Sequence, residues 1–210
     1  MRLGATLAHF SPAPPPAIAE WSKRLVGAGF ESLWVPQIVG RGFLVPDPFI
    51  TLAVAATATA GVELGTATVQ VPLHHPVDLA HRILSLLHVC GDRLTLGVSP
   101  GSTDTDYATF DRDYAERFRT FHHNMVRLLT PLEHGQDEHA DLAPAALARR
   151  PPLLLGSWGA NVERAAREFD GWLASGYRST PDQIIAAHGR YRAAGGRRAI
   201  VCARPAGRRG

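Results

Sequence analysis

Residues 153–168 have the sequence LLLGSWGANVERAARE, in which an apolar run turns through two glycines into an amphipathic segment. A short apolar run followed directly by a helix is typical of a strand buried on both faces of a parallel sheet. Glycine lets the backbone approach a ligand, and the start of a helix offers unpaired N–H groups to an anion. Residues 156–160 therefore fit a phosphate site, although an ordinary strand-to-helix turn would use the same glycines.

The same alternation of apolar run and amphipathic segment recurs along the whole chain. Seven apolar runs predict strands, at residues 2–8, 32–35, 62–69, 93–98, 153–156, 172–175 and 199–203. Alternating strands and helices are typical of an α/β fold with a parallel sheet. We expect one domain that covers residues 1–210.

Helix starts are marked by capping residues and by proline. Asp47 before Pro48 and His75 before Pro76 each predict the first turn of a helix. Thr180 is followed by proline, and Gln183 completes a capping box. A long helix is predicted over residues 114–134, and the polar stretch 136–150 predicts a surface excursion.

Two architectures fit seven strand-helix units: an open doubly wound sheet and a TIM-type (β/α)8 barrel. Gly4 is the only glycine near the first strand, so no Gly-x-Gly-x-x-Gly signature of dinucleotide-binding sheets follows that strand, which favours the barrel. Barrels of this type need eight units and about 250 residues. We therefore expect an incomplete barrel that lacks its last unit. Because such a barrel leaves two strand edges unpaired, a homodimer is also predicted.

Composition narrows the class of protein. Hydrophobic residues make up 45% and charged residues 20% of the 210-residue chain, which indicates a globular protein with a buried core. The longest apolar stretch, residues 49–62, is shorter than the about 20 residues that a membrane-spanning helix needs. Prolines at positions 12, 14, 15 and 16 interrupt the N-terminal apolar patch before a signal peptide could form. We expect a cytoplasmic protein without a membrane segment.

The distribution of charged residues, cysteines and histidines argues against nucleic-acid-binding, disulfide-linked and metal-binding proteins. The net charge is +3, but the arginines are spread along the chain rather than clustered, which argues against a nucleic-acid partner. Cys90 and Cys202 belong to no disulfide or metal spacing, so both are predicted to be free thiols. The ten histidines provide no three-ligand set, so no metal site is expected.

Taken together, several segments resemble one known family. These are GFESLWVPQ at 29–37, PDPF at 46–49, VELGTA at 62–67, DRLTLGV at 92–98, and LLLGSWG at 153–159. In order and spacing they are similar to the bacterial luciferase-like superfamily of flavin- and deazaflavin-dependent monooxygenases and oxidoreductases. Within it, WVPQI at 34–38 and LGSWG at 155–159 resemble enzymes that use the deazaflavin coenzyme F-420. The resemblance covers nearly the whole chain.

The resemblance implies a barrel whose cofactor lies across the carboxyl ends of the strands. It places the cofactor ring against Ala67 and Thr68, where the family often has a non-proline cis peptide. His74 and Tyr177 follow strands at this expected active face, so they are the candidates to meet a small-molecule substrate. The remaining implied cofactor contacts are the ring-edge or tail residues Gln37, Ser99 and Gly101, the phosphate residues Gly156, Ser157, Trp158, Gly159 and Ala160, and a second phosphate ligand, Arg117.

Two departures from the luciferase pattern affect the expected activity. Ile38 stands where luciferases have a titratable histidine, so bioluminescence is not expected. Pro100 replaces a phosphate-binding arginine, which favours F-420 over FMN. The resemblance thus implies hydride transfer between F-420, or FMN as second choice, and an organic substrate. The alternative is a shortened, non-catalytic member that acts as a cofactor-binding or partner subunit.

Overall fold

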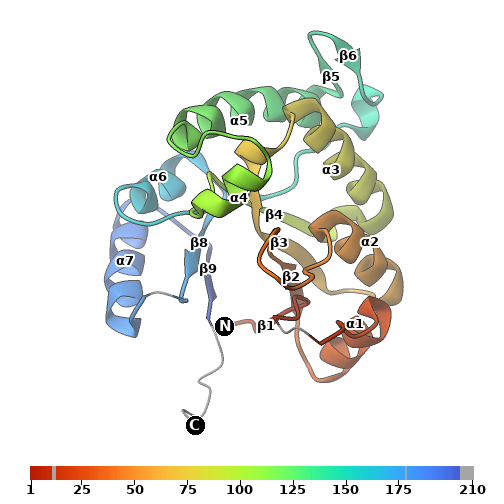
Figure 1. The fold of residues 1–210 in the computed structure, drawn as a ribbon, viewed down its shortest axis with the longest axis vertical. Helices are drawn as coiled ribbons and strands as arrows, with labels where there is room; N and C mark the ends of the chain where they lie inside the picture. The colour runs from red at the N-terminus through yellow and green to blue at the C-terminus, as the bar shows by residue number, and fades with distance from the viewer. Residues whose placement is uncertain (11–12, 178, 204–210) are drawn as a thin grey trace.

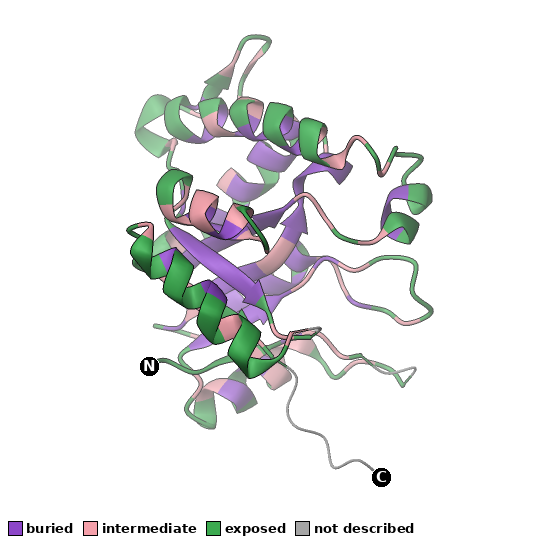
Figure 2. Cartoon of the chain, turned by 90° about the vertical axis from the view of Figure 1, so that its left-hand side faces the viewer, coloured by how far each residue is buried: buried purple, intermediate pink, exposed green. Residues whose placement is uncertain are grey.

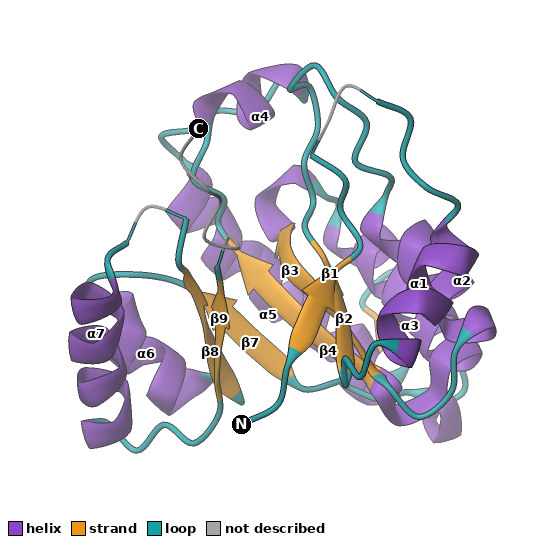
Figure 3. Ribbon diagram, turned by 90° about the horizontal axis from the view of Figure 1, so that it is seen from below, coloured by secondary structure: helices purple, strands orange, loops and turns teal. Residues whose placement is uncertain are grey.

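The computed structural model describes residues 1–10, 13–177 and 179–203 and has a curved, open parallel sheet at its centre (Figures 1 and 3). The sheet contains seven strands in the order β1-β2-β3-β4-β7-β8-β9, and every neighbouring pair is parallel. The strands are β1 Gly4–Thr6, β2 Ser32–Val35, β3 Glu63–Gln70, β4 Leu94–Ser99, β7 Leu153–Gly156, β8 Gly171–Ser175 and β9 Ala199–Cys202. All seven predicted strands are confirmed, and the sheet is that of an incomplete barrel.

Within the described residues, six helices cover the outer face of this sheet, whereas α4 Asp104–Thr109 lies apart from them, beyond the strand ends, as Figure 3 shows. The six are α1 Ile18–Gly27, α2 Pro48–Ala58, α3 Pro76–Cys90, α5 Arg117–His134, α6 Asn161–Glu168 and α7 Pro181–Ala193, with short 3-10 turns η1 Val71–Leu73, η2 Gly91–Arg93 and η3 Ala145–Leu147. Buried strands and the exposed outer sides of the helices are distinguished in Figure 2. None of the helices in the described ranges is long and apolar enough to cross a membrane.

The predicted helix starts are confirmed, since α2, α3 and α7 begin at Pro48, Pro76 and Pro181, and the first and last of them have side-chain caps. Asp47 Oδ1 accepts from the backbone N–H groups of Phe49 and Ile50, at 2.8 and 3.1 Å. Thr180 and Gln183 form the reciprocal capping box. The long helix α5 begins at Arg117, later than predicted, because Asp113 accepts from a backbone N–H two residues on and holds a turn before the helix.

The stretch 136–150 is a surface excursion, as predicted. It contains a short antiparallel hairpin, β5 Gln136–Asp137 with β6 Ala140–Asp141, followed by η3. The hairpin projects beyond the end of α5 in Figure 1. The hairpin follows the end of α5 and precedes β7, so it lies at the edge of the sheet where β7 begins.

Two apolar layers hold the fold together. The larger lies between the sheet and the helices and includes Leu52, Ile83, Leu96 and Leu128, which are fully buried. The smaller lies on the inner face and is built on Trp34, with Leu154 and Leu173. Cys90 and Cys202 are free thiols, and burial raises the pKa of Cys202 to about 11.

Candidate functional site

Three neighbouring strands approach one another at the carboxyl edge around Thr68. The peptide bond between Ala67 and Thr68 is cis, as the resemblance implied. The hydroxyl oxygens of Thr68 and Ser99 are 2.6 Å apart. A Cβ built on Gly156 would lie 2.7 Å from Thr68 Cγ2, so the Thr68 side chain occupies the space that a side chain at 156 would need. Four of the predicted cofactor residues, Ala67, Thr68, Ser99 and Gly156, are thus brought together.

The loop after β4 is fixed next to this cluster. Gly101 has a φ of +80°, in the left-handed region that glycine adopts without strain, and its N–H donates to Ser99 Oγ at 3.2 Å. The Tyr107 hydroxyl donates to the Pro100 carbonyl. Burial raises the pKa of Tyr107, so the phenol keeps the proton that this hydrogen bond requires.

The side chains of Ser157 and Trp158 make contacts within the protein. Ser157 Oγ donates to the Asn161 carbonyl at 3.0 Å, and the Ser157 carbonyl accepts from Trp172 Nε1 at 2.9 Å. The Trp158 ring packs edge-on against Trp172, with 5.7 Å between the ring centroids. Any ligand at this turn would therefore be bound by backbone groups rather than by these side chains.

The backbone at the start of α6 offers such groups. Gly159 has a φ of +64°, and Ala160 occupies the N-cap position without a side-chain cap. Within the described part of the chain, the N–H groups of Gly159, Ala160 and Asn161 donate to no acceptor. Unpaired N–H groups and the helix dipole at such a turn favour an anion. The geometry therefore fits the predicted phosphate site.

A polar network lies beside the Thr68 cluster, and it includes residues that sequence reasoning missed. Gln37 Oε1 accepts from the Gln70 backbone N–H at 2.8 Å. Gln70 Nε2 donates to Asp106 Oδ2 at 2.7 Å, and Arg41 also binds this carboxylate at 2.7 Å. Asp106 is 1% exposed. The network joins the loop after β2 to β3 and to α4.

His74 connects this network to α5. Its Nε2 lies 2.9 Å from Gln37 Nε2, and its carbonyl accepts from Asn124 Nδ2 at 3.2 Å. Burial, and then the positive charge of Arg82, lower the pKa of His74. The imidazole is therefore held in its neutral form near neutral pH.

A cleft of about 330 Å³ opens beside His74, between the loop after β2 and the starts of α2 and α3. It is lined by Gln37, Ile38, Val39, Val45, Pro46, Asp47, Pro48, Leu73, His74, His75, Asp78, Arg82 and Phe110. A larger hollow, of about 550 Å³, is lined by residues that run from His134 to Ala145 around the hairpin. That hollow follows the end of α5, on the amino side of the sheet, away from the predicted cofactor residues.

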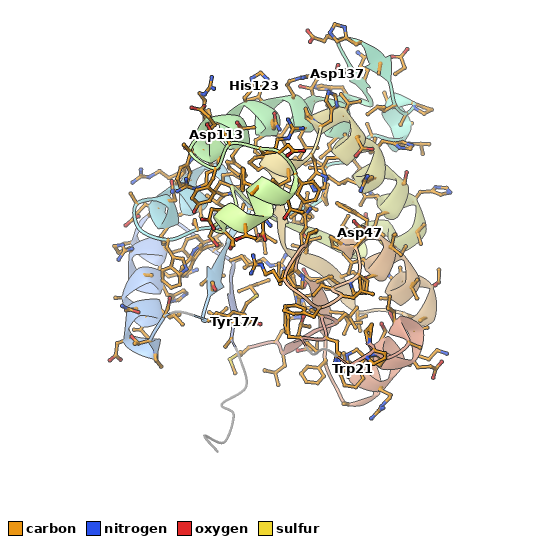
Figure 4. The ribbon with its side chains drawn as sticks, in the orientation of Figure 1. Trp21, Asp47, Asp113, His123, Asp137 and Tyr177 are labelled. Atoms are coloured by element: carbon orange, nitrogen blue, oxygen red, sulfur yellow. The ribbon has the colours of Figure 1, made fainter. Side chains whose placement is uncertain are left out.

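Arg117 and Tyr177 are not brought into this cluster. The Arg117 guanidinium lies over the Tyr114 and Phe118 rings, at 3.9 and 4.3 Å, and donates to the Tyr114 carbonyl. Tyr177 is 48% exposed after β8, and Figure 4 shows it well separated from Asp47 at the start of α2. Their predicted roles remain predictions. Among the described residues, no group of three or more His, Cys, Asp or Glu side chains could hold a metal ion.

A family model described as luciferase-like monooxygenase matches residues 2–205. The chain belongs to the luciferase-like monooxygenase family. Its sequence is 36% identical over 171 residues to 4-hydroxyprotoasukamycin monooxygenase of Streptomyces nodosus subsp. asukaensis, a match that covers 78% of this chain and 45% of that protein. The chain thus spans less than half of this luciferase-like relative.

Two solved structures share the luciferase-like fold. The oxygenating constituent of 3,6-diketocamphane monooxygenase from Pseudomonas putida superposes with a TM-score of 0.75 at 16% identity, over 93% of this chain and 63% of that one. Tetrahydromethanopterin reductase from Methanopyrus kandleri superposes with a TM-score of 0.67 at 19% identity, over 92% of this chain and 60% of that one. Both cover most of this chain and confirm its architecture.

Proposed function

We propose that this chain binds coenzyme F-420, with FMN as the second choice, and transfers a hydride between it and a small organic substrate. The observation that carries the proposal is the arrangement at the carboxyl edge. Thr68 in β3 and Ser99 in β4 have paired hydroxyls, and Gly156 in β7 lies next to Thr68. The unpaired N–H groups at the start of α6 follow β7 directly.

Relatives support both cofactors. The Pseudomonas putida enzyme is in complex with FMN, and the Methanopyrus kandleri reductase depends on coenzyme F420. Preference for F-420 rests on Ile38 and Pro100, which replace a histidine and an arginine of the luciferase pattern. Either cofactor, when bound, supplies or accepts the hydride.

The chain's own residues would bind and orient the cofactor. Backbone N–H groups of Gly159, Ala160 and Asn161 would hold its phosphate at the positive end of α6. Thr68 and Ser99 would support the ring, since their hydroxyls are paired with each other at the edge of the sheet. Gln37, which Gln70 holds in place, would line the side of the cofactor ring that faces His74.

Direct titration tests the proposal. Purified protein is mixed with F-420 or with FMN, and cofactor fluorescence and the thermal unfolding temperature are followed. We expect quenching and a rise in Tm with at least one cofactor at tens of micromolar. Binding of neither cofactor would overturn the proposal and favour the non-catalytic alternative.

A charge at the start of α6 tests the phosphate site itself. We predict that Ala160→Asp weakens cofactor binding at least tenfold, because its carboxylate repels the phosphate. The fold should be retained, since a negative charge is favourable at a helix N-terminus. Ala160→Asn is the matched control: it has nearly the same shape without the charge, and should bind within about threefold of wild type. Equal affinities of the two variants would remove the phosphate from this turn.

A further inference from the structure

The hydrogen bonds around Gln37 determine which proton His74 carries. The Gln70 backbone N–H can only donate, so the Gln37 atom that it contacts at 2.8 Å is the amide oxygen. The other end of that amide, the NH₂ group, then donates to His74 Nε2 at 2.9 Å. Because this nitrogen accepts, the neutral ring has its proton on Nδ1.

The surroundings of His74 favour this neutral form. Burial and Arg82 lower its pKa, while Asp78 and Asp47 act in the opposite direction with smaller effect. Asn124 holds the backbone of His74 from α5. No described residue accepts a hydrogen bond from His74 Nδ1. This nitrogen is not one of the fully buried side-chain atoms that lack a partner, so it is not sealed off from the surroundings. The Nδ1–H group is therefore an available donor on a ring that lines the cleft.

The rest of the cleft indicates the kind of molecule that it suits. Seven of its thirteen lining residues are apolar, and its volume of about 330 Å³ lies at the small end of the range of ligand pockets. Two carboxylates and one guanidinium are present. Arg82 lies 3.0 Å from Asp78 and 3.9 Å from Asp47, which leaves one negative charge in excess. Such a cleft disfavours anions and accommodates an uncharged molecule.

We propose that this cleft binds a compact, uncharged organic molecule that carries a carbonyl group, which accepts a hydrogen bond from His74 Nδ1–H. The inference rests on the proposed function, for which it names the substrate class. His74 would then touch the substrate directly and act as a catalytic residue. Gln37 and Gln70 are positioning residues, because their hydrogen bonds determine which nitrogen of His74 carries the proton. Asp47, labelled in Figure 4, marks the wall of the cleft formed by the start of α2.

The tautomer is tested on the wild-type protein without any ligand. Two-bond ¹H–¹⁵N spectra of ¹⁵N-histidine-labelled protein should show His74 protonated on Nδ1 and unprotonated on Nε2 at neutral pH. His74→Phe assigns the signal by its disappearance. A ring protonated on Nε2, or on both nitrogens, would overturn the assignment.

Ligand binding is tested with 2-decalone, a bicyclic ketone, and with cyclohexanecarboxylate as the anionic comparison, both in the absence of cofactor. We expect 2-decalone to shift the His74 signals and to bind at least tenfold more tightly than the carboxylate. His74→Phe should weaken ketone binding at least tenfold, whereas His81→Phe, an exposed position of α3 outside the cleft, should leave it within twofold.

Ketone affinity that is unchanged in His74→Phe, a preference for the carboxylate, or no binding of the ketone would overturn the proposal. Because neither F-420 nor FMN is present, these outcomes are independent of the cofactor titration. A protein that binds cofactor but not ketone would retain the proposed function and lose only its substrate class.

Discussion

At the scale of single residues, Gly97 in β4 lies where β3 and the Leu173 side chain leave no room for a side chain. A Cβ at this position would lie 2.1 Å from the Thr66 carbonyl oxygen and 3.0 Å from Leu173 Cδ1. We predict that Gly97→Ala destabilises the protein by about 1–3 kcal/mol or more, because backbone must move to admit the methyl group. Urea denaturation followed by circular dichroism measures the change.

Gly189 provides the control for that substitution. It lies within α7, and a Cβ there meets nothing within 4 Å. Gly189→Ala should therefore stabilise the protein by about 0.5–1 kcal/mol, since alanine loses less conformational freedom in a helix. Two variants of equal stability would contradict the close contact at Gly97.

His74 should make the folded protein less stable at acidic pH. Burial, and then Arg82, lower its pKa in the folded state below the ordinary value of 6.5. Below pH 6.5 the unfolded chain therefore binds a proton that the folded protein resists, and stability falls as the pH decreases towards the folded-state pKa. We predict a decrease in the free energy of unfolding between pH 7.5 and pH 5, and a smaller decrease in His74→Phe. Equal pH dependence of both proteins would exclude this contribution.

At the scale of secondary structure, local chemistry was sufficient to predict the seven strands of the main sheet and the starts of α2, α3 and α7, but not α4 or the β5–β6 hairpin. Strands β2 and β7 begin and end at the predicted residues, because each is a short apolar run bounded by a turn. Asp47 and Thr180 cap their helices with the predicted geometry, since a capping bond spans only two or three residues. The start of α5 was missed because the turn held by Asp113 precedes an equally polar helix.

The capping box of α7 has a measurable value. Thr180 Oγ1 accepts from the Gln183 N–H at 3.3 Å, and Gln183 Oε1 accepts from the Thr180 N–H at 2.9 Å. We predict that Thr180→Ala reduces the free energy of unfolding by about 1 kcal/mol. Thr180→Ser keeps the hydroxyl and should remain within about 0.5 kcal/mol of wild type. Identical urea midpoints for the alanine and serine variants would show that the box adds no stability.

At the scale of the whole molecule, the site was predicted only where its residues follow strands. Ala67, Thr68, Ser99 and Gly156 come together because parallel strands end at one edge. The network that fixes His74 is different. Asp106 is buried by partners 36 and 65 positions away, and nothing in its polar neighbourhood distinguishes it from a surface residue. Contacts at such separations are set by packing rather than by local pattern.

The open sheet leads to a prediction about assembly. Within the described residues, β1 and β9 each pair with a single neighbour, so one edge of each strand has unpaired backbone groups. Unpaired edges tend to associate unless charge or another element blocks them. We predict a homodimer through an edge, observed by size-exclusion chromatography with light scattering at tens of micromolar.

A matched pair of substitutions tests whether the β9 edge forms this dimer. Val201 lies in β9 and is 46% exposed, whereas Val126 lies in α5 and is 64% exposed. Val201→Lys should shift the protein to monomer, because a charged side chain on an edge strand opposes pairing with a second copy. Val126→Lys carries the same change away from the edges and should remain dimeric. A monomeric wild-type protein, or a dimer that persists in Val201→Lys, would mean that this edge does not join two copies.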